Sequence, residues 1–184
     1  MIGVLLAGGR GRRLGGRPKA AIEVAGRPLA AYPASALAAV CQRVAFVAKA
    51  TSELPELPGV ERWDEPPEPE HPVAGIVHAL EQAGEPVLVV GADMPYVTPD
   101  ACASVLAGGG TAPAAVAVAG GIVQPLLAVY APAALEPLKN AIPDGRLTDM
   151  VEALRPGRVA VPPAIVRSVN TPDDLAAAEA ELSA

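Results

Sequence analysis

The chain opens with MIGVLLAGGRGRRLGGRPK, residues Met1 to Lys19, and the rest of the sequence is organised around this stretch. Residues 2–6 form a short apolar run that ends at Ala7, Gly8 and Gly9. An apolar run of this length bounded by glycine is typical of a buried strand. The opening stretch therefore predicts a strand that leads directly into a glycine-rich loop.

Positive charge is concentrated in this loop. Of the 14 basic residues in the chain, five fall within ten positions that hold no acidic residue: Arg10, Arg12, Arg13, Arg17 and Lys19. Glycine lets backbone N–H groups approach a ligand closely, and guanidinium groups form forked hydrogen bonds to phosphate oxygens. This combination indicates a polyphosphate site.

The loop has three other interpretations. A basic run is often only a solvated surface loop. A Walker loop needs Gly-Lys followed by Ser or Thr, whereas Lys19 follows Pro18 and precedes Ala20. The dinucleotide fingerprint would start at Gly9 and Gly11, but Leu14 takes its third glycine position, so a NAD(P) site has weak support.

Length and composition favour one globular domain. The chain has 184 residues, of which 51% are apolar and 18% charged, and its formal net charge is −6. An acidic chain with one basic loop argues for a focused anion site and against broad nucleic-acid binding. Aromatic residues make up only 3% of the chain, so a base-stacking platform for nucleic acid is not expected.

Cysteine usage and hydropathy point to the cytoplasm. Cys41 and Cys102 are isolated and form no C-x-x-C motif, which gives little support to zinc or a disulfide framework and fits a reducing compartment. No apolar stretch reaches membrane-spanning length without interruption, and the first residues do not read as an export signal. We therefore expect neither a membrane nor a nucleic-acid partner.

Strand-like and helix-like segments alternate along most of the chain, which predicts an α/β fold with a mostly parallel sheet and helices on both faces. A hairpin around Gly120 and Gly121 is expected to add an antiparallel element. The predicted strands are residues 2–6, 44–48, 60–63, 86–91, 114–119, 124–130 and 166–169; the predicted helices are residues 29–40, 73–82, 99–106, 132–140 and 147–154, with a last one from 172.

Two later positions carry chemistry. Asp93 follows the most strand-like run of the chain, so it is expected at the carboxyl end of a central strand, where ligands bind in open α/β sheets. Asn170 precedes Thr171 and Pro172, which are typical of the cap and first position of a helix. The alternative for both is a purely structural role as a turn or cap residue.

Four blocks of this sequence resemble, in the same order, those of the nucleotidyltransferases, and most closely the molybdenum cofactor guanylyltransferases. The first is Leu6-Ala7-Gly8-Gly9 followed by Arg13 and Lys19, and the later ones are residues 71–76, 92–95 and 170–175, with Gln124-Pro125-Leu126 as a further shared segment. Two usual family residues are replaced here, by His71 and by Ser168. The resemblance implies a three-layer α/β/α sandwich of the nucleotide-diphospho-sugar transferase type. It also implies a single domain over residues 1–184, with a nucleotide-binding half (1–106) and an acceptor-binding half (107–184).

The resemblance further implies a reaction: transfer of GMP from GTP to molybdopterin that carries molybdenum, with release of pyrophosphate. It implies Mg²⁺ as cofactor, held by Asp93, and cofactor-delivery proteins or molybdoenzymes as partners. Arg13, Lys19 and Asp93 would be catalytic, and Gly75 and Asn170 would contact the acceptor. The implied nucleotide-binding residues are Leu6, Ala7, Gly8, Gly9, Arg13, Lys19, Asp64 and Asp93.

Other functions remain open at this point. A related enzyme could use CTP, or could transfer the nucleotide to another phosphorylated acceptor such as cobinamide phosphate. The Gly8-Gly9 pair favours the guanine-using relatives, since cytidine-using ones tend toward A-A-G. A nucleotide-binding regulator without turnover is the alternative from a different class. The joint presence of Arg13, Lys19 and Asp93 argues against it, because a mere binder needs no metal carboxylate.

Overall fold

The computed structural model describes residues 1–8, 10–11, 14, 16–141 and 145–183. Its centre is a seven-stranded sheet with the order β11-β9-β10-β8-β1-β6-β7. The strands of this sheet are β1 (Ile2–Leu6), β6 (Arg43–Lys49), β7 (Val60–Glu65), β8 (Val87–Gly91), β9 (Ala114–Ala119), β10 (Ile122–Tyr130) and β11 (Gly157–Ala160). Strands β8, β1, β6 and β7 run parallel to one another, and β11 runs parallel to β9.

Strand β10 is antiparallel to both of its neighbours, β8 and β9. It forms with β9 the hairpin that the sequence predicts, and the turn uses Gly120 and Gly121, both with positive φ. The expected mostly parallel α/β sheet is therefore confirmed, and so is its antiparallel insertion.

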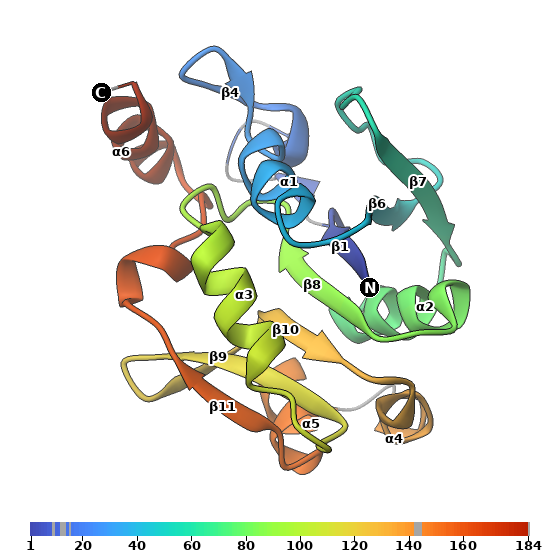
Figure 1. The fold of residues 1–184 in the computed structure, drawn as a ribbon. Coiled ribbons are helices and arrows are strands. Elements are labelled where there is room, and N and C mark those ends of the chain that lie inside the picture. The colour runs from blue at the N-terminus through green and yellow to red at the C-terminus, as the bar shows by residue number, and fades with distance from the viewer. Residues whose placement is uncertain (9, 12–13, 15, 142–144, 184) are drawn as a thin grey trace.

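Helices cover both faces of the sheet (Figure 1). The helices are α1 (Ala31–Ala38), α2 (Pro72–Ala83), α3 (Pro99–Ala107), α4 (Leu135–Ala141), α5 (Leu147–Ala153) and α6 (Pro172–Leu182). Side chains of α1 and α3 share one buried cluster with Leu5 and Leu88, whereas those of α2, α4 and α5 share another with Val4 and Val89. Because successive residues of a strand point to opposite faces, neighbouring positions feed the two cores. The result is the predicted three-layer sandwich.

The last helix, α6, packs outside the two helix layers that cover the faces of the sheet. Two short ribbons follow β1, one made of β2 (Arg10–Gly11) and β3 (Arg17–Pro18), the other of β4 (Glu23–Val24) and β5 (Arg27–Pro28). A third buried cluster joins Val24 and Leu29 to Val169 and to Ala178 of α6. Figure 1 shows α6 beside β4, so the end of the chain lies against its beginning.

One predicted element is wrong. Residues 166–169 do not form a strand: Pro163–Val166 is a 3₁₀ turn, and the edge strand is β11 at Gly157–Ala160. A Cβ at Gly157 would lie 2.4 Å from the Gly108 carbonyl oxygen, so only glycine lets β11 run this close to the end of α3. This fit between distant segments carries no periodic signal in the sequence.

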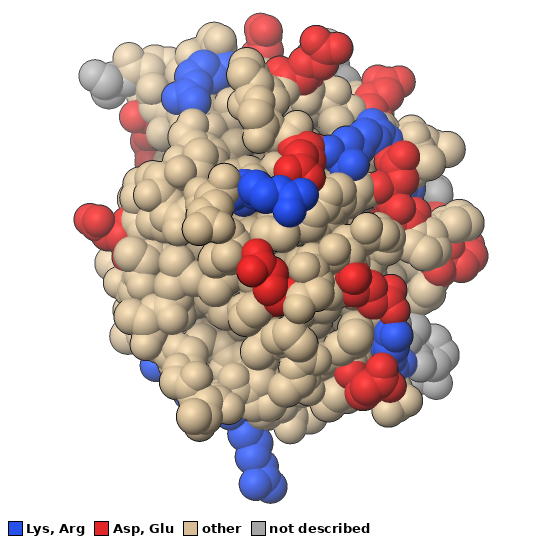
Figure 2. All heavy atoms as spheres, turned by 45° about the vertical axis from the view of Figure 1, so that its right-hand side comes forward, with Lys and Arg blue, Asp and Glu red and all other residues tan. Residues whose placement is uncertain are grey.

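Charged side chains of opposite sign lie close together on the β7 side of the molecule. Arg43 pairs with Glu61 and Arg62 with Asp64, at 2.8 and 2.7 Å. Figure 2, which brings this side forward, shows acidic and basic side chains interspersed over the upper and right-hand part of the view and a large uncharged area on the left. None of the helices among the described residues is long and apolar enough to cross a membrane.

Candidate functional site

Four parallel strands end at one edge of the sheet and place the candidate residues there. Asp93 lies two residues after β8, Gly8 lies two residues after β1, and β6 and β7 end at Lys49 and Glu65. The strand ends are tied together by the backbone: Ala92 donates to Leu6 at 3.0 Å, and Ala7 donates to Val47 at 3.1 Å. The carboxyl edge is where open α/β sheets bind ligands.

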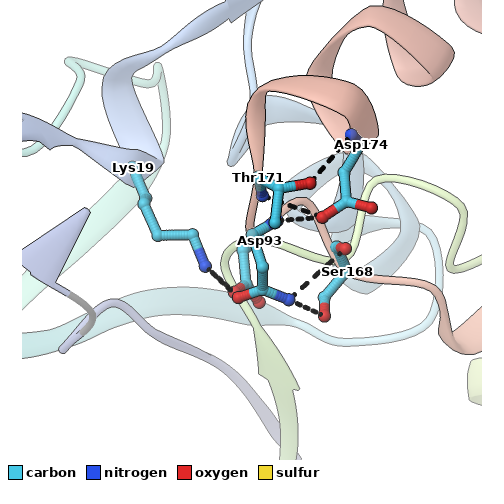
Figure 3. A network of polar contacts seen from close by, with 6 residues as sticks. Lys19, Asp93, Ser168, Thr171 and Asp174 are labelled. Carbon is cyan, nitrogen blue, oxygen red and sulfur yellow. Dashed lines mark hydrogen bonds and ion pairs between the residues drawn. The ribbon is translucent and has the colours of Figure 1, made fainter. Parts of the chain in front are cut away.

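Lys19, Asp93 and Asn170 meet at this edge. The Lys19 ammonium group forms an ion pair with the Asp93 carboxylate and donates to Oδ1 of Asn170 at 2.8 Å. Figure 3 shows Lys19 reaching toward Asp93 across the edge of the sheet. The side chain of Lys19 is only 12% exposed and that of Asp93 25%, so this contact is largely shielded from water.

The loop before α6 delivers Asn170. Val169 donates its backbone N–H to the Asp93 carbonyl oxygen at 2.9 Å. Thr171 and Asp174 form a capping box, in which Asp174 accepts from the backbone N–H groups of Asn170 and Thr171 at 2.9 and 2.8 Å. The Asn170 N–H bond first, and then those of Thr171, lower the pKa of the Asp174 carboxyl. Asn170 is thus fixed by a helix start as well as by Lys19.

The Asp93 carboxylate and the Asn170 amide oxygen converge on one cationic group, the Lys19 ammonium. Oxygen donors around a single positive centre are what a hard divalent cation prefers, and Mg²⁺ takes few protein ligands because water and substrate phosphates complete its coordination. The donor set therefore fits Mg²⁺. Among the described residues, no group of three His, Cys, Asp or Glu side chains could hold a metal by itself.

A cavity of about 790 Å³ extends along the same edge. This volume lies within the usual range for small-molecule sites, about 300–1,000 Å³. Its wall includes residues from all four strand ends, the glycine-rich loop and the start of α2: Leu6, Ala7, Gly8, Lys19, Lys49, Glu65, Gly75, Ala92 and Asp93. The paired side chains of Lys19 and Asp93 form one part of the wall, beside the end of β8. Lys49 and Glu65 form another part, at the ends of β6 and β7.

Glu65 is a feature of this wall that the sequence analysis missed. The residue is 9% exposed, and its Oε2 has no hydrogen-bond partner among the described residues. Burial raises the pKa of the Glu65 carboxyl, although Lys49, whose Nζ lies 3.5 Å from Oε1, opposes this effect. The signal that could have found it is the alternation along residues 60–65, in which neighbours face opposite sides of the strand.

Asp64, the expected nucleotide contact, points elsewhere. Its carboxylate pairs with Arg62, its side chain is 52% exposed, and it does not line the cavity. The strand was expected to end at Trp63, but β7 continues to Glu65 and sends that side chain inward instead. Because successive side chains of a strand face opposite sides, Glu65 lies on the buried side of β7 and Asp64 on the exposed side.

The remaining expected residues divide into two groups. Leu6, Ala7, Gly8 and Gly75 line the cavity, as do Lys19 and Asp93. Gly9 and Arg13 lie outside the described residues. At Gly75 a Cβ would lie 2.7 Å from Leu6 Cδ2 and 3.2 Å from Glu65 Oε2, so glycine lets both side chains close against α2.

Comparison with known proteins identifies the family of this chain. Residues 3–159 match the family model described as the MobA-like NTP transferase domain. This chain belongs to that family. Nucleotidyl transfer is accordingly its class of reaction, and the matched range holds Lys19, Asp93 and the cavity wall, whereas Asn170 comes from beyond it.

One curated relative is named molybdenum cofactor guanylyltransferase, from Cereibacter sphaeroides. It is 35% identical over 135 residues, and the match spans 62% of this chain and 66% of the relative. This chain thus covers just under two thirds of that protein's length.

Two solved structures share the fold along nearly their whole length. Molybdopterin-guanine dinucleotide biosynthesis protein A from Archaeoglobus fulgidus is 26% identical with a TM-score of 0.75, and the match covers 100% of this chain and 99% of that one. The 2-C-methyl-D-erythritol 4-phosphate cytidylyltransferase of Thermus thermophilus is 24% identical with a TM-score of 0.73, over 98% of each chain. The second likeness shows the fold alone.

Proposed function

We propose that this protein transfers GMP from GTP to molybdopterin that carries molybdenum, and releases pyrophosphate. The observation that carries the proposal is the meeting of Lys19, Asp93 and Asn170 beside a nucleotide-sized cavity, whose wall includes Lys19 and Asp93. The guanylyltransferase name of a 35% identical relative supports the choice of nucleotide and acceptor. The Gly8-Gly9 pair supports the same choice.

The reaction that we propose joins an acceptor phosphate to the α-phosphorus of GTP. An oxygen of the acceptor phosphate attacks the α-phosphorus, a new P–O bond forms, and the bond to the β-phosphate oxygen breaks in line with the attack. The acceptor phosphate is already ionised at neutral pH, so no general base is required. Such chemistry depends on positioning and on charge neutralisation.

Residues of this chain would supply both the positioning and the charge neutralisation. The backbone around Gly8 and the side chains of Lys19 and, by the family pattern, Arg13 would bind the β- and γ-phosphates. The ammonium of Lys19 would stabilise the negative charge that develops on the leaving pyrophosphate. The Asp93 carboxylate, with the Asn170 oxygen beside it, would hold Mg²⁺, which neutralises phosphate charge when bound. Asn170 and Gly75 would be the contacts of the acceptor side, and Asn170 comes from the half of the chain after residue 106.

One assay tests this function. The purified protein is incubated with Mg²⁺, molybdopterin carrying molybdenum and each of GTP, CTP, ATP and UTP in turn, and pyrophosphate release is measured together with the mass of the product. We expect release with GTP and a product enlarged by one GMP. Release with CTP alone would leave nucleotidyl transfer standing and overturn the guanylyl assignment. Selective GTP binding without any release would support a regulator instead.

A further inference from the structure

Ser168 holds one end of the side-chain amide of Asn170. Nδ2 of Asn170 donates to the Ser168 hydroxyl at 2.7 Å and to the Ser168 carbonyl oxygen at 3.4 Å. In Figure 3, Lys19 and Ser168 approach the centre of this network from opposite sides. Ser168 is also one of the two positions at which the usual family residue is replaced, and the phosphate chemistry described above gives it no role.

The chemistry of its partners fixes which way the Asn170 amide points. At the end away from Ser168, Oδ1 of Asn170 accepts from the Lys19 ammonium at 2.8 Å. An ammonium group only donates and a backbone carbonyl only accepts. With the amide turned over, two donors would face each other at Lys19, and two acceptors would face each other at the Ser168 carbonyl. The network therefore directs the amide oxygen toward Lys19 and the amide nitrogen toward Ser168.

The segment that carries Ser168 is fixed on both sides. The Arg167 guanidinium lies over the Tyr96 ring, 3.9 Å from its centre. Val169 is 1% exposed, and its backbone N–H donates to the Asp93 carbonyl oxygen at 2.9 Å. Tyr96 and Asp93 both belong to the loop after β8. The two neighbours of Ser168 thus hold it against the loop that carries the proposed metal ligand.

An amide that faces a metal must present its oxygen. A hard cation such as Mg²⁺ is bound by the oxygen of an amide and not by its nitrogen. The last torsion of an asparagine side chain is soft, so an amide held at one end only by water can turn over. In the proposed reaction Lys19 would bind phosphates, and the contacts with Ser168 would then keep Oδ1 of Asn170 on the side of Asp93.

We propose that Ser168 is a positioning residue for nucleotidyl transfer, whose hydroxyl keeps the Asn170 amide oxygen directed at the metal that Asp93 would hold. Ser168 acts only through Asn170. The assignment rests on the proposed function for the presence of that metal. The anchoring of the amide by the hydroxyl does not depend on the proposed function, so it can be tested separately.

Nuclear magnetic resonance tests the anchoring without nucleotide or metal. The chain has two asparagines, Asn140 and Asn170, so the NH₂ signal of Asn170 can be assigned by its loss in Asn170→Ala. We expect Ser168→Ala to speed exchange of the Asn170 NH₂ hydrogens with water by about 2- to 10-fold, the scale of one net hydrogen bond. Ser168→Thr, which keeps the hydroxyl, should retain the wild-type rate, and Asn140 serves as internal control. An unchanged rate in Ser168→Ala would overturn the proposal.

The effect of Mg²⁺ on GTP binding tests what the anchoring does. Calorimetric titration with GTP in Mg²⁺ and in EDTA gives the factor by which the metal strengthens binding. Ser168→Ala should lower this factor by about 2- to 10-fold, and Ser168→Thr should restore it. In an Asn170→Ala background, Ser168→Ala should have no further effect, because Ser168 acts through that side chain. The matched control is Ser104→Ala, which removes an exposed hydroxyl that donates to the Asp100 carbonyl on α3.

The outcomes separate a positioning role from a merely structural one. Equal weakening of GTP binding in Mg²⁺ and in EDTA would show that Ser168 only supports the local fold, and would overturn the proposal. So would a further loss on adding Ser168→Ala to Asn170→Ala, or a wild-type protein whose GTP binding does not respond to Mg²⁺. If both readouts behave as expected while no pyrophosphate is released with molybdopterin, the role of Ser168 stands and the proposed transfer reaction fails.

Discussion

Lys19 donates a hydrogen bond to Asn170 at 2.8 Å, although the two residues are 151 positions apart in the chain. The same ammonium pairs with Asp93, which follows the central strand β8. The start, the middle and the end of the sequence therefore meet in one cluster (Figure 3). This cluster is where we expect substitutions to affect nucleotidyl transfer most strongly.

Removal of the Lys19 ammonium should slow the reaction. We expect Lys19→Ala to lower kcat for pyrophosphate release by roughly 10²–10³, the scale for loss of one preorganised charge-stabilising donor. The control is Lys139→Ala, which removes an exposed lysine of α4 that pairs with Glu81. Similar small losses in both variants would mean that Lys19 acts only through overall charge.

Asp93 should be needed for metal-dependent turnover and not for folding. Asp93→Asn keeps the size of the side chain and one acceptor oxygen but removes the charge that a hard cation favours. We expect a normal circular dichroism spectrum, loss of most pyrophosphate release and a weaker response to added Mg²⁺. Asp100→Asn, in the first turn of α3, provides the matched control. Near-native turnover of Asp93→Asn would remove this residue from the site.

The capping box at the start of α6 should stabilise the protein in a pH-dependent way. The folded-state pKa of Asp174 is lowered, chiefly by the Asn170 N–H, so its ionised form contributes stability above the unfolded pKa and loses it as the pH falls through the folded value. We therefore expect Asp174→Asn to lower the free energy of unfolding at pH about 7 and to have little effect in strong acid. Urea denaturation at several pH values measures this, with the neighbouring Asp173→Asn as control. An equal loss at every pH would exclude the ionised carboxylate as the cause.

The buried carboxylate of Glu65 should lower the free energy of unfolding at neutral pH. Its folded-state pKa is raised by burial, so the folded state binds more protons than the unfolded state in the window between the two values, and stability falls as the pH rises through it. We expect Glu65→Gln to unfold at higher urea concentration than the wild type at pH about 7, with the difference shrinking toward pH 4 and below. Lys49 retains its bonds to Pro66 and Pro69 in this variant. A less stable variant at neutral pH would indicate that the ion pair with Lys49 outweighs the burial.

Local pattern in the sequence was sufficient for most of the fold. The apolar run of residues 2–6, the strand before Asp93 and the proline-capped helix starts at Thr98 and Thr171 each carry their signal within a few residues. The order of these segments also placed Asp93 correctly, because the carboxyl ends of parallel strands share one edge. The hairpin at Gly120 and Gly121 was equally local.

The tertiary structure decided which distant segments pack together and which side chains face the site. The edge strand β11 depends on a close approach of Gly157 to Gly108, and the meeting of Asn170 with Lys19 depends on α6 packing against the β4 ribbon. That Glu65 and not Asp64 lines the cavity depends on which face of β7 packs inward, since neighbouring residues of a strand face opposite sides. The sequence by itself determined which residue types could serve the site. Packing between distant segments determined which of them face it, because burial and register are properties of the assembled sheet and not of any short stretch of chain.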